Sequence, residues 1–354
     1  MFVMQPLNPM EAVRADEAAT PALELVCPAG SLPALKAAVD HGANCVYLGL
    51  RDATNARNFA GLNFDEAAIA NGIAYAHARG CKVFMALNTY PQASNPGPWR
   101  SALDKAVDLG VDAVILADPG LMHYAVQRHP RLRLHLSVQG SATNYEAINF
   151  YREQFGIVRA VLPRVLSMEQ VRQVIDRTPV EIEVFGFGSL CVMVEGRCAL
   201  SSYVTGESPN THGVCSPPKA VRWVETPQGC ESRLNGVLID RYAPGENAGY
   251  PTLCKGRFDV GDDENYYAIE EPTSLNTLEL LPQLLKMGVR AIKIEGRQRS
   301  PAYVAQVTQV WREAMDQCLA YPHRYAPKTR WMASLDQVAE GQQHTLGAYH
   351  RPWK

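Results

Sequence analysis

One short phrase recurs along the chain and limits what it can fold into. In each copy a glycine ends a stretch of helical periodicity, and a run of apolar, often β-branched residues follows. The copies begin at Gly42, Gly80, Gly110, Gly156 and Gly288. Glycine directly after a helix adopts the left-handed conformation that terminates the helix. Because a short apolar run is typical of a strand buried on both faces, the phrase predicts a repeated helix–turn–strand unit.

Counting the apolar runs predicts eight strands that alternate with helices. The strands are expected over residues 23–27, 45–49, 83–87, 112–117, 133–138, 158–162, 181–185 and 290–294. Helix starts are marked by the capping residues Ser31, Asp65, Thr143, Ser167 and Ser274. Eight parallel strands with right-handed crossovers favour an α/β fold of the (βα)8-barrel type, or a distorted relative of it. A doubly wound sheet is the alternative, but residues 27–30 are not the phosphate-binding glycine loop that it would need.

The alternation of strands and helices is interrupted once. The seventh strand ends near Phe185, and the next helix is expected over 275–286, about 90 residues later and beyond any ordinary loop length. Short strand-like pieces occur between them, at 221–225 and 236–240. We expect an inserted subdomain on the C-terminal face of the barrel, where active sites of such folds lie. The predicted organisation is a flexible extension (1–22), a barrel (23–319) that contains the insertion (186–274), and an irregular tail (320–354).

Composition narrows the class of protein. Lys and Arg number 34 against 36 Asp and Glu, and a net charge of −2 excludes a dominant basic field for nucleic acid. The longest apolar stretches are about seven residues, against the ~20 that a membrane span needs. No signal-peptide pattern opens the chain, so a cytoplasmic protein is expected. In that compartment nine cysteines, an odd number, are not read as disulfides.

The cysteines fall into two groups. Those on predicted strands or helices are expected to be ordinary buried thiols: Cys27, Cys45, Cys81 and Cys318. Five others lie in the insertion, and four of them stand close to glycines, which permit close approach to a metal centre: Cys191, Cys198, Cys215 and Cys254. Cys230 resembles a turn residue and is expected to stay outside the group. The spacing favours an iron–sulfur cluster over zinc, which prefers closely paired cysteines, and leaves open that no metal binds.

Polar residues at predicted strand ends face the expected site. They are Asn88, Asp118, Gln139, Arg164, Glu295 and Arg297. Arg57, Arg197 and Arg297 stand near glycines or strand ends and are candidates to hold a carboxylated ligand in bidentate fashion. The alternative is that each forms a structural pair with a glutamate across the strands. His135 on the fifth strand is expected to be a packed barrel residue, and the catalytic residues stay unknown.

Four segments together resemble the collagenase-like, U-type peptidase family. They are residues 25–36, 187–198, 270–279 and 293–303, and the resemblance extends over about 23–350. Residues 54–57, 207–210 and 345–350 are similar to the branch of that family that acts in ubiquinone biosynthesis.

The resemblance implies an iron–sulfur component of oxygen-independent ring hydroxylation in ubiquinone synthesis. It implies a [4Fe–4S] cluster on the four insertion cysteines, a UbiV-like paralogue as heterodimer partner and a UbiT-like lipid carrier. The acceptor would be a ubiquinone precursor, and the family-level oxygen donor is prephenate. An all-thiolate cluster has no open iron site, which favours electron transfer over oxygen activation.

Two other functions stay open. Relatives of the same family hydroxylate RNA bases, but such a protein should carry a basic face, and the insertion mixes both signs of charge, so no nucleic acid is expected. A peptidase is the third possibility. The sequence has no His-Glu-x-x-His or Gly-x-Ser-x-Gly motif, and no cysteine is obviously paired with a histidine.

Overall fold

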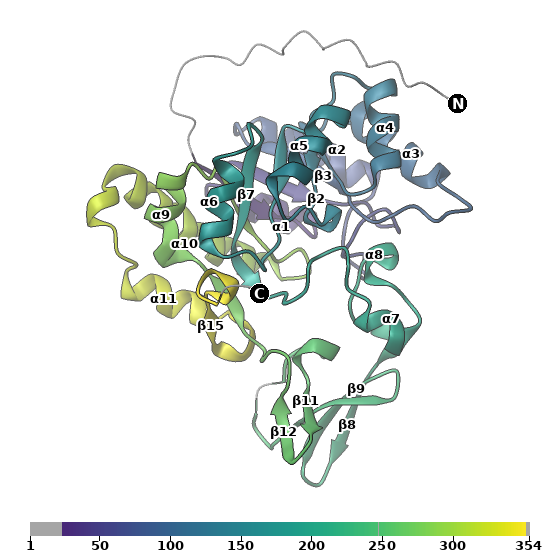
Figure 1. The fold of residues 1–354 in the computed structure, drawn as a ribbon, viewed down its shortest axis with the longest axis vertical. Helices are drawn as coiled ribbons and strands as arrows, with labels where there is room; N and C mark the ends of the chain where they lie inside the picture. Colours follow the sequence, from purple (N-terminus) through teal and green to yellow (C-terminus); the bar gives the residue numbers. More distant parts are fainter. Residues whose placement is uncertain (1–22, 247, 352–354) are drawn as a thin grey trace.

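Eight parallel strands, in sequence order, close on themselves in the computed structural model, which describes residues 23–246 and 248–351 (Figure 1). Each strand pairs with the next, and β14 closes the ring by pairing with both β7 and β1. The strands are β1 (Glu24–Pro28), β2 (Cys45–Leu48), β3 (Lys82–Leu87), β4 (Ala113–Leu116), β5 (Leu134–Leu136), β6 (Arg159–Val161), β7 (Glu181–Ser189) and β14 (Ala291–Ile294). The predicted (βα)8 barrel is confirmed, while the extension predicted over 1–22 lies outside the described residues.

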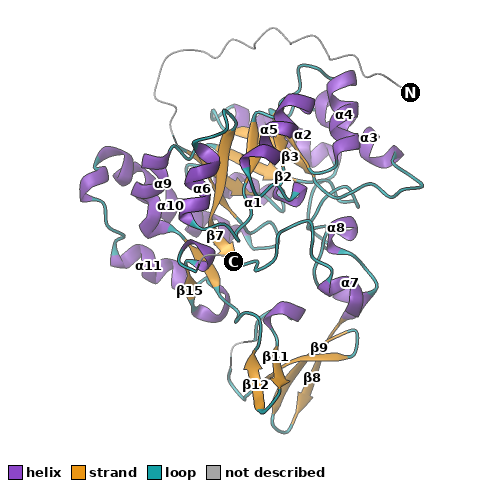
Figure 2. Cartoon of the chain, in the orientation of Figure 1, coloured by secondary structure: helices purple, strands orange, loops and turns teal. Residues whose placement is uncertain are grey.

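Helices surround the barrel, as Figure 2 shows in purple. They are α1 (Leu32–Asp40), α2 (Glu66–His77), α3 (Gly97–Asp108), α4 (Pro119–Arg128), α5 (Tyr145–Phe155), α6 (Met168–Ile175), α9 (Leu281–Met287) and α10 (Pro301–Ala320). Ser31, Asp65 and Ser167 cap helices as predicted, and Ser167 forms a capping box with Gln170. The cap of α5 is Asn144 rather than Thr143, because the Asn144 side chain accepts from the Ala147 amide.

The interior of the barrel combines apolar and charged side chains. Apolar residues such as Phe84 and Ile115 form one buried cluster inside the strands. Arg159, Glu183 and Lys293 are buried beside them. Both cations pair with Glu183, Lys293 Nζ at 2.6 Å and Arg159 Nη1 at 3.6 Å from its carboxylate. His135 is 2 % exposed and packs edge-on against Phe84, which confirms it as a packed barrel residue.

The insertion begins with a strand that the sequence did not predict at this length. β7 runs past the barrel to Ser189, and its end pairs antiparallel with β13 (Ser274–Asn276). The predicted helix over 275–286, with Ser274 as its cap, is therefore wrong at its start. Ser274 lies in β13, whose backbone is held by β7 and by β15 (His344–Thr345), and α9 begins only at Leu281.

The middle of the insertion projects from the barrel as a small β-rich arm, residues 221–267 (Figure 1). Two short helices, α7 (Leu200–Thr205) and α8 (Pro209–His212), lead to it. Its strands are β8 (Val221–Thr226), β9 (Gly229–Leu234), β10 (Val237–Tyr242), β11 (Arg257–Val260) and β12 (Asp263–Tyr267). A three-residue core of Val221, Leu234 and Ile239 supports the first three strands.

The tail is more regular than predicted. Residues 329–336 form helix α11 (Thr329–Asp336), whose buried side chains Trp331 and Leu335 belong to the main core. β15 then pairs in parallel with β13, which ties the end of the chain to the insertion. The irregular tail is thus a wrong expectation, because these apolar residues pack against α10, a contact that the local sequence pattern does not reveal. Among the described residues no helix is long and apolar enough to cross a membrane.

Candidate functional site

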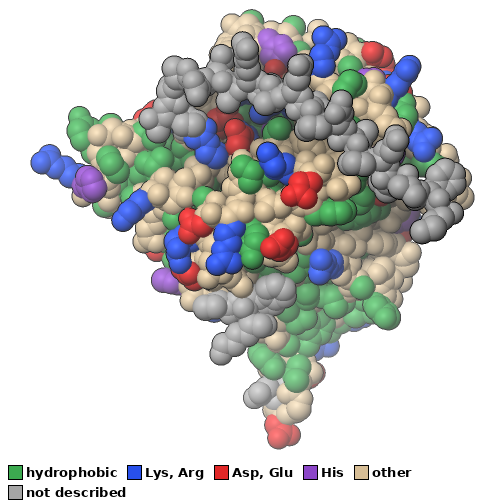
Figure 3. Space-filling view, turned by 45° about the horizontal axis from the view of Figure 1, so that its top comes forward, with side chains coloured by type: hydrophobic (Ala, Val, Ile, Leu, Met, Phe, Trp, Pro, Cys, Tyr) green, Lys and Arg blue, Asp and Glu red, His purple; other side chains and the backbone are tan. Residues whose placement is uncertain are grey.

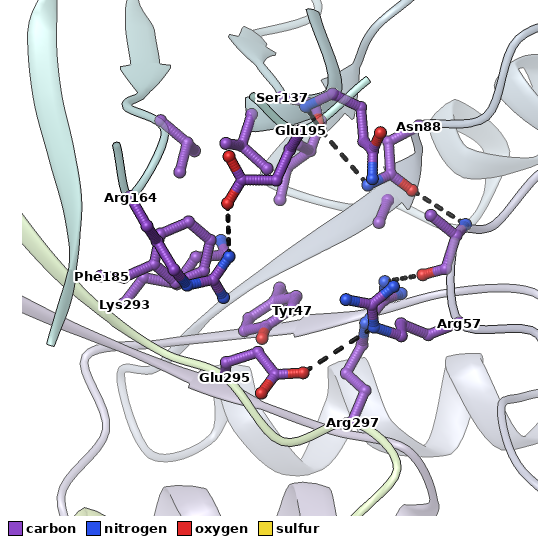
Figure 4. A pocket seen from close by; sticks show the side chains of 16 residues that line it. Tyr47, Arg57, Asn88, Ser137, Arg164, Phe185, Glu195, Lys293, Glu295 and Arg297 are labelled. Atoms are coloured by element: carbon purple, nitrogen blue, oxygen red, sulfur yellow. Dashed lines mark hydrogen bonds and ion pairs between the residues drawn. The ribbon is translucent and has the colours of Figure 1, made fainter. Parts of the chain in front are cut away.

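A cavity lies at the carboxyl ends of the barrel strands (Figure 4). The empty space there, part of it open to solvent, is about 580 Å³, and six of the sixteen lining residues are charged. The polar residues that line it are Tyr47, Arg57, Asn88, Ser137, Gln139, Arg164, Glu195, Lys293, Glu295 and Arg297. Because strands β2, β3, β5, β6, β7 and β14 or the loops after them contribute to this wall, the barrel itself positions the site.

The predicted strand-end residues meet here with one exception. Asn88 fixes the wall by accepting from the Ala56 amide at 3.1 Å and donating to Ser137 at 3.3 Å. Asp118 does not line the cavity, because its carboxylate caps α4 by accepting from the Leu121 amide at 2.7 Å. The other five strand-end candidates all line the cavity.

Arg297 is the most unusual group of the site. Its side chain is buried, 6 % of the residue being exposed, and it donates to the side-chain oxygen of Asn55 and the carbonyl of Ala56. These partners are neutral, and Arg297 forms no ion pair with any residue that the structure describes. Burial lowers the pKa of Arg297 to about 10. Glu295 acts on Arg297 at longer range, but no carboxylate of the described residues forms an ion pair with it. A buried cation without an ion pair of its own is costly, which makes this position a candidate place for an anionic ligand.

Arg57 faces Glu295 across the cavity mouth, with 3.8 Å between Nε and Oε1. Burial alone would lower the pKa of Arg57, but the charge of Glu295, together with smaller contributions from Cys215, Cys191 and Tyr47, raises that pKa. Burial likewise opposes ionisation of Glu295, whose pKa is nevertheless lowered by Arg57 and Arg164. Arg57 has a φ of +104°, in the left-handed region that non-glycine residues rarely occupy. Strained residues of this kind gather at functional sites.

Arg164 and Glu195 form an ion pair in the wall of the cavity. Nη1 of Arg164 lies 2.5 Å from Oε1 of Glu195, and its guanidinium stacks 3.5 Å from the centre of the Phe185 ring. Burial raises the pKa of Glu195 in spite of Arg164. Glu195 comes from the insertion, from the loop between Cys191 and Cys198, so the insertion completes the cavity.

Sequence reasoning missed Glu195, Tyr47 and Lys293. Lys293 lies 4.0 Å from the centre of the Tyr47 ring, and burial lowers its pKa despite Glu183. A signal for Lys293 exists, because a charged residue within the apolar strand Ala291–Ile294 must point into the barrel or into water.

Arg197 is placed elsewhere. It is exposed, does not line the cavity, and donates to the Ser141 carbonyl at 3.4 Å. Of the three candidate arginines the structure therefore brings Arg57 and Arg297 together and leaves Arg197 outside.

The scaffold cysteines Cys27, Cys45, Cys81 and Cys318 are buried, as predicted. Of the insertion cysteines, Cys191, Cys198 and Cys215 lie in loops, Cys254 lies in a short 3-10 helix, and Cys230 lies within β9. Cys215 is the centre of this group, since it interacts electrostatically with each of the three others: Cys191, Cys198 and Cys254. Burial raises the pKa of the Cys191, Cys215 and Cys254 thiols, although part of Cys215 reaches solvent. Cys230 interacts instead with Glu225 and Glu231 of the arm.

The four thiols fit an iron–sulfur cluster in kind, because thiolates are its usual ligands. Gly188, Gly196 and Gly213, each close in sequence to one of these cysteines, have positive φ, so the backbone can approach closely there. Among the described residues, however, no three potential ligands lie close enough to hold a metal ion as they stand. The loops would have to draw together around the group. Arg57, which interacts with both Cys215 and Cys191, connects these thiols with the cavity.

Fold and cavity together define a (βα)8-barrel protein whose site lies at the strand ends under a cysteine-bearing insertion. The chain belongs to peptidase family U32, whose model matches residues 30–352, and this confirms the family expected from the sequence.

Three curated relatives are similar over most of the chain. It is 30 % identical over 316 residues to tRNA hydroxylation protein P1 of Bacillus subtilis, covering 89 % of this chain and 68 % of that protein. It is 33 % identical over 318 residues to tRNA hydroxylation protein P of Escherichia coli, covering 84 % and 68 %. It is 29 % identical over 345 residues to the 23S rRNA 5-hydroxycytidine C2501 synthase of Escherichia coli, covering 93 % of this chain but 47 % of that enzyme.

Proposed function

We propose that this protein is a UbiU-like iron–sulfur component of an oxygen-independent hydroxylase that acts on the ring of a ubiquinone precursor. The names of the relatives support hydroxylation as the reaction class. In such a reaction a ring C–H bond becomes C–OH. A donor molecule gives up the oxygen and accepts the two electrons that the ring loses, so no dioxygen is needed.

The observation that carries the proposal is the excess of positive charge in the cavity. Four cationic side chains line it: Arg57, Arg164, Lys293 and Arg297. Glu295, Glu195 and, beneath the cavity, Glu183 pair with the first three, which leaves Arg297 without an ion pair of its own among the described residues. A carboxylated donor, for which prephenate is the family-level candidate, would supply the missing charge. Guanidinium groups suit this role because they bind carboxylates in bidentate fashion.

The insertion supports the second part of the proposal, a [4Fe–4S] cluster on Cys191, Cys198, Cys215 and Cys254. A cluster held by four thiolates would supply electron transfer. Arg57 interacts electrostatically with Cys215 and Cys191 and also lines the cavity. Its positive charge would therefore act on both the cluster and the donor.

An RNA-base hydroxylase is the second candidate, because the curated relatives carry RNA hydroxylation names. The charges of the insertion favour a ubiquinone precursor over RNA as the acceptor. Its basic side chains are largely neutralised by carboxylates, in the pairs Lys219–Glu207, Arg233–Glu231, Arg241–Glu231 and Arg257–Asp240. A surface that binds nucleic acid by phosphate contacts needs cations free to meet phosphates.

The partners are proposals as well: a UbiV-like paralogue in a heterodimer, and a UbiT-like carrier that presents the lipid precursor. Apolar side chains are exposed on both faces of the arm, among them Trp223, Val224 and Val237. Hydrophobic side chains, green in Figure 3, also reach the surface toward the narrow lower end of that view. Anaerobic co-expression with the paralogue followed by size-exclusion chromatography tests the heterodimer. A chain that elutes as a monomer in the presence of the paralogue contradicts it.

A gene deletion tests the function. The deletion strain should lose ubiquinone in anaerobic culture and keep it in aerobic culture, where oxygen-dependent hydroxylases remain. Quinone extraction and mass spectrometry of RNA nucleosides from the same cultures separate the candidates. Normal anaerobic ubiquinone with loss of a hydroxylated nucleoside assigns the RNA function, and normal levels of both point back to the peptidase.

A further inference from the structure

Lys255, the residue directly after Cys254, is a buried cation outside the strand-end cavity. Its side chain is 6 % exposed, and Nζ donates to the Glu340 carboxylate at 2.6 Å and to the Ser189 hydroxyl at 3.0 Å. The same hydroxyl donates to Glu340 at 2.8 Å, so the three side chains form a closed triad. A charge is costly to bury even when it is paired, so its place beside an insertion cysteine calls for an explanation.

The triad joins three segments that are distant in the sequence. Ser189 ends β7, two residues before Cys191. Lys255 follows Cys254 in the insertion, and Glu340 lies in the tail of the chain. The segments that carry the first and the last insertion cysteine are therefore held together by one ion pair and one shared hydroxyl.

Two members of the triad are also held by backbone hydrogen bonds. The Glu340 amide donates to the Ser274 hydroxyl of β13 at 2.8 Å. The Ser189 amide donates to the carboxylate of Glu295 at 3.0 Å, and Glu295 lines the strand-end cavity. The ammonium of Lys255 is thus held in a fixed place, on a path of contacts that connects the cavity with the insertion.

The Lys255 ammonium acts on the neighbouring thiols. It interacts electrostatically with Cys215 and Cys254, and for both thiols it partly offsets the rise in pKa that burial causes. A cluster on four thiolates is an anion and gains one further negative charge on reduction, and its reduction potential depends on the charges around it. A cation nearby therefore favours the reduced cluster, and a carboxylate nearby disfavours it.

We propose that Lys255 and Glu340 are positioning residues that tune the reduction potential of the cluster that Cys254 helps to bind. Lys255 raises the potential, and Glu340 limits that rise while it holds the ammonium beside Cys254. This inference rests on the proposed cluster and names two residues, outside its ligands, that adjust it.

Redox titration of the anaerobically purified full chain tests the inference, with dithionite as the electron donor and electron paramagnetic resonance as the readout. Iron content is measured on the same samples. Lys255→Met removes a positive charge and should lower the midpoint potential, whereas Glu340→Gln removes a negative charge and should raise it. Each shift should change the reduction equilibrium about tenfold, which is about 59 mV for one electron. Lys255→Arg keeps the charge and should keep the wild-type potential.

The sign of the shifts separates tuning from a role in structure alone. Both single variants break the same ion pair, so a purely structural effect should move the potential in one direction. The double variant Lys255→Met/Glu340→Gln removes both charges and should return close to the wild-type value. Lys219→Met is the matched control, because Lys219 also pairs with an insertion glutamate, Glu207, but its side chain is 73 % exposed. An exposed charge is screened, so this variant should keep the wild-type potential.

The outcomes also separate this inference from the proposed cluster. Unchanged potentials, shifts of one sign in Lys255→Met and Glu340→Gln, or an equal shift in Lys219→Met overturn the tuning role and leave the cluster standing. If Lys255→Met holds no iron, a rise in Glu340→Gln together with a wild-type potential in Lys255→Arg supports the tuning role, and any other result contradicts it. A wild type without iron overturns both proposals.

Discussion

Acid should destabilise this protein through His135, a residue inside the barrel. Burial, together with the charges of Arg159, Arg133, Lys293 and Lys82, lowers the pKa of His135 well below its ordinary value. The folded state therefore keeps this imidazole neutral, whereas the unfolded chain takes up a proton below about pH 6.5. Since the unfolded state binds the extra proton, stability falls as the pH falls, by up to about 1.4 kcal/mol per pH unit.

Replacing His135 with leucine should remove this dependence. Between pH 7.5 and 5 the wild type should lose about 2 kcal/mol more unfolding free energy than His135→Leu. Urea unfolding at four pH values in this range, followed by tryptophan fluorescence, measures the difference, and His323→Leu at an exposed position should keep the wild-type slope. If the curves of wild type and His135→Leu stay parallel, the buried imidazole does not titrate as argued.

Two further predictions concern local structure. Gly206 and Gly213 both end short helices with positive φ, but a Cβ at Gly213 would lie 2.8 Å from Ala56, and nothing lies within 4 Å at Gly206. In thermal unfolding, Gly206→Ala should lower the free energy of unfolding by about 1 kcal/mol. Gly213→Ala should lower it clearly more and should also weaken anion binding. Equal losses in the two variants would show that the contact of Gly213 with Ala56 is unimportant. Ser167→Ala removes a capping box and should cost about 1 kcal/mol in urea unfolding, and no change would contradict the capping role.

The barrel could be predicted from the sequence because its signals are local. The glycine that ends each helix and the apolar run behind it act within about ten residues, and all eight strands were found. β13 and β15 were missed because each is stabilised by a partner distant in sequence: Ser274 pairs with Ser189 and with His344. Helix α11 was missed because Trp331 depends on packing against α10.

The candidate site was predictable where it depends on strand ends. Arg297 and Glu295 follow β14 directly, so barrel topology alone brings them to the cavity. Glu195 and Arg197 are two residues apart in one loop, and only its folded conformation decides that the first enters the cavity and the second faces solvent. No periodicity distinguishes them. The position of Arg57 likewise depends on a left-handed φ that no sequence rule assigns to arginine.

Iron and acid-labile sulfide per chain, measured after anaerobic purification, test the central claim most directly. The wild type should hold about four irons, and Cys230→Ala the same number, because Cys230 lies in the arm, away from the other insertion cysteines. Cys191→Ala/Cys254→Ala should hold none. Full iron in that double variant, or its loss in Cys230→Ala, would contradict the assignment of the cluster to Cys191, Cys198, Cys215 and Cys254.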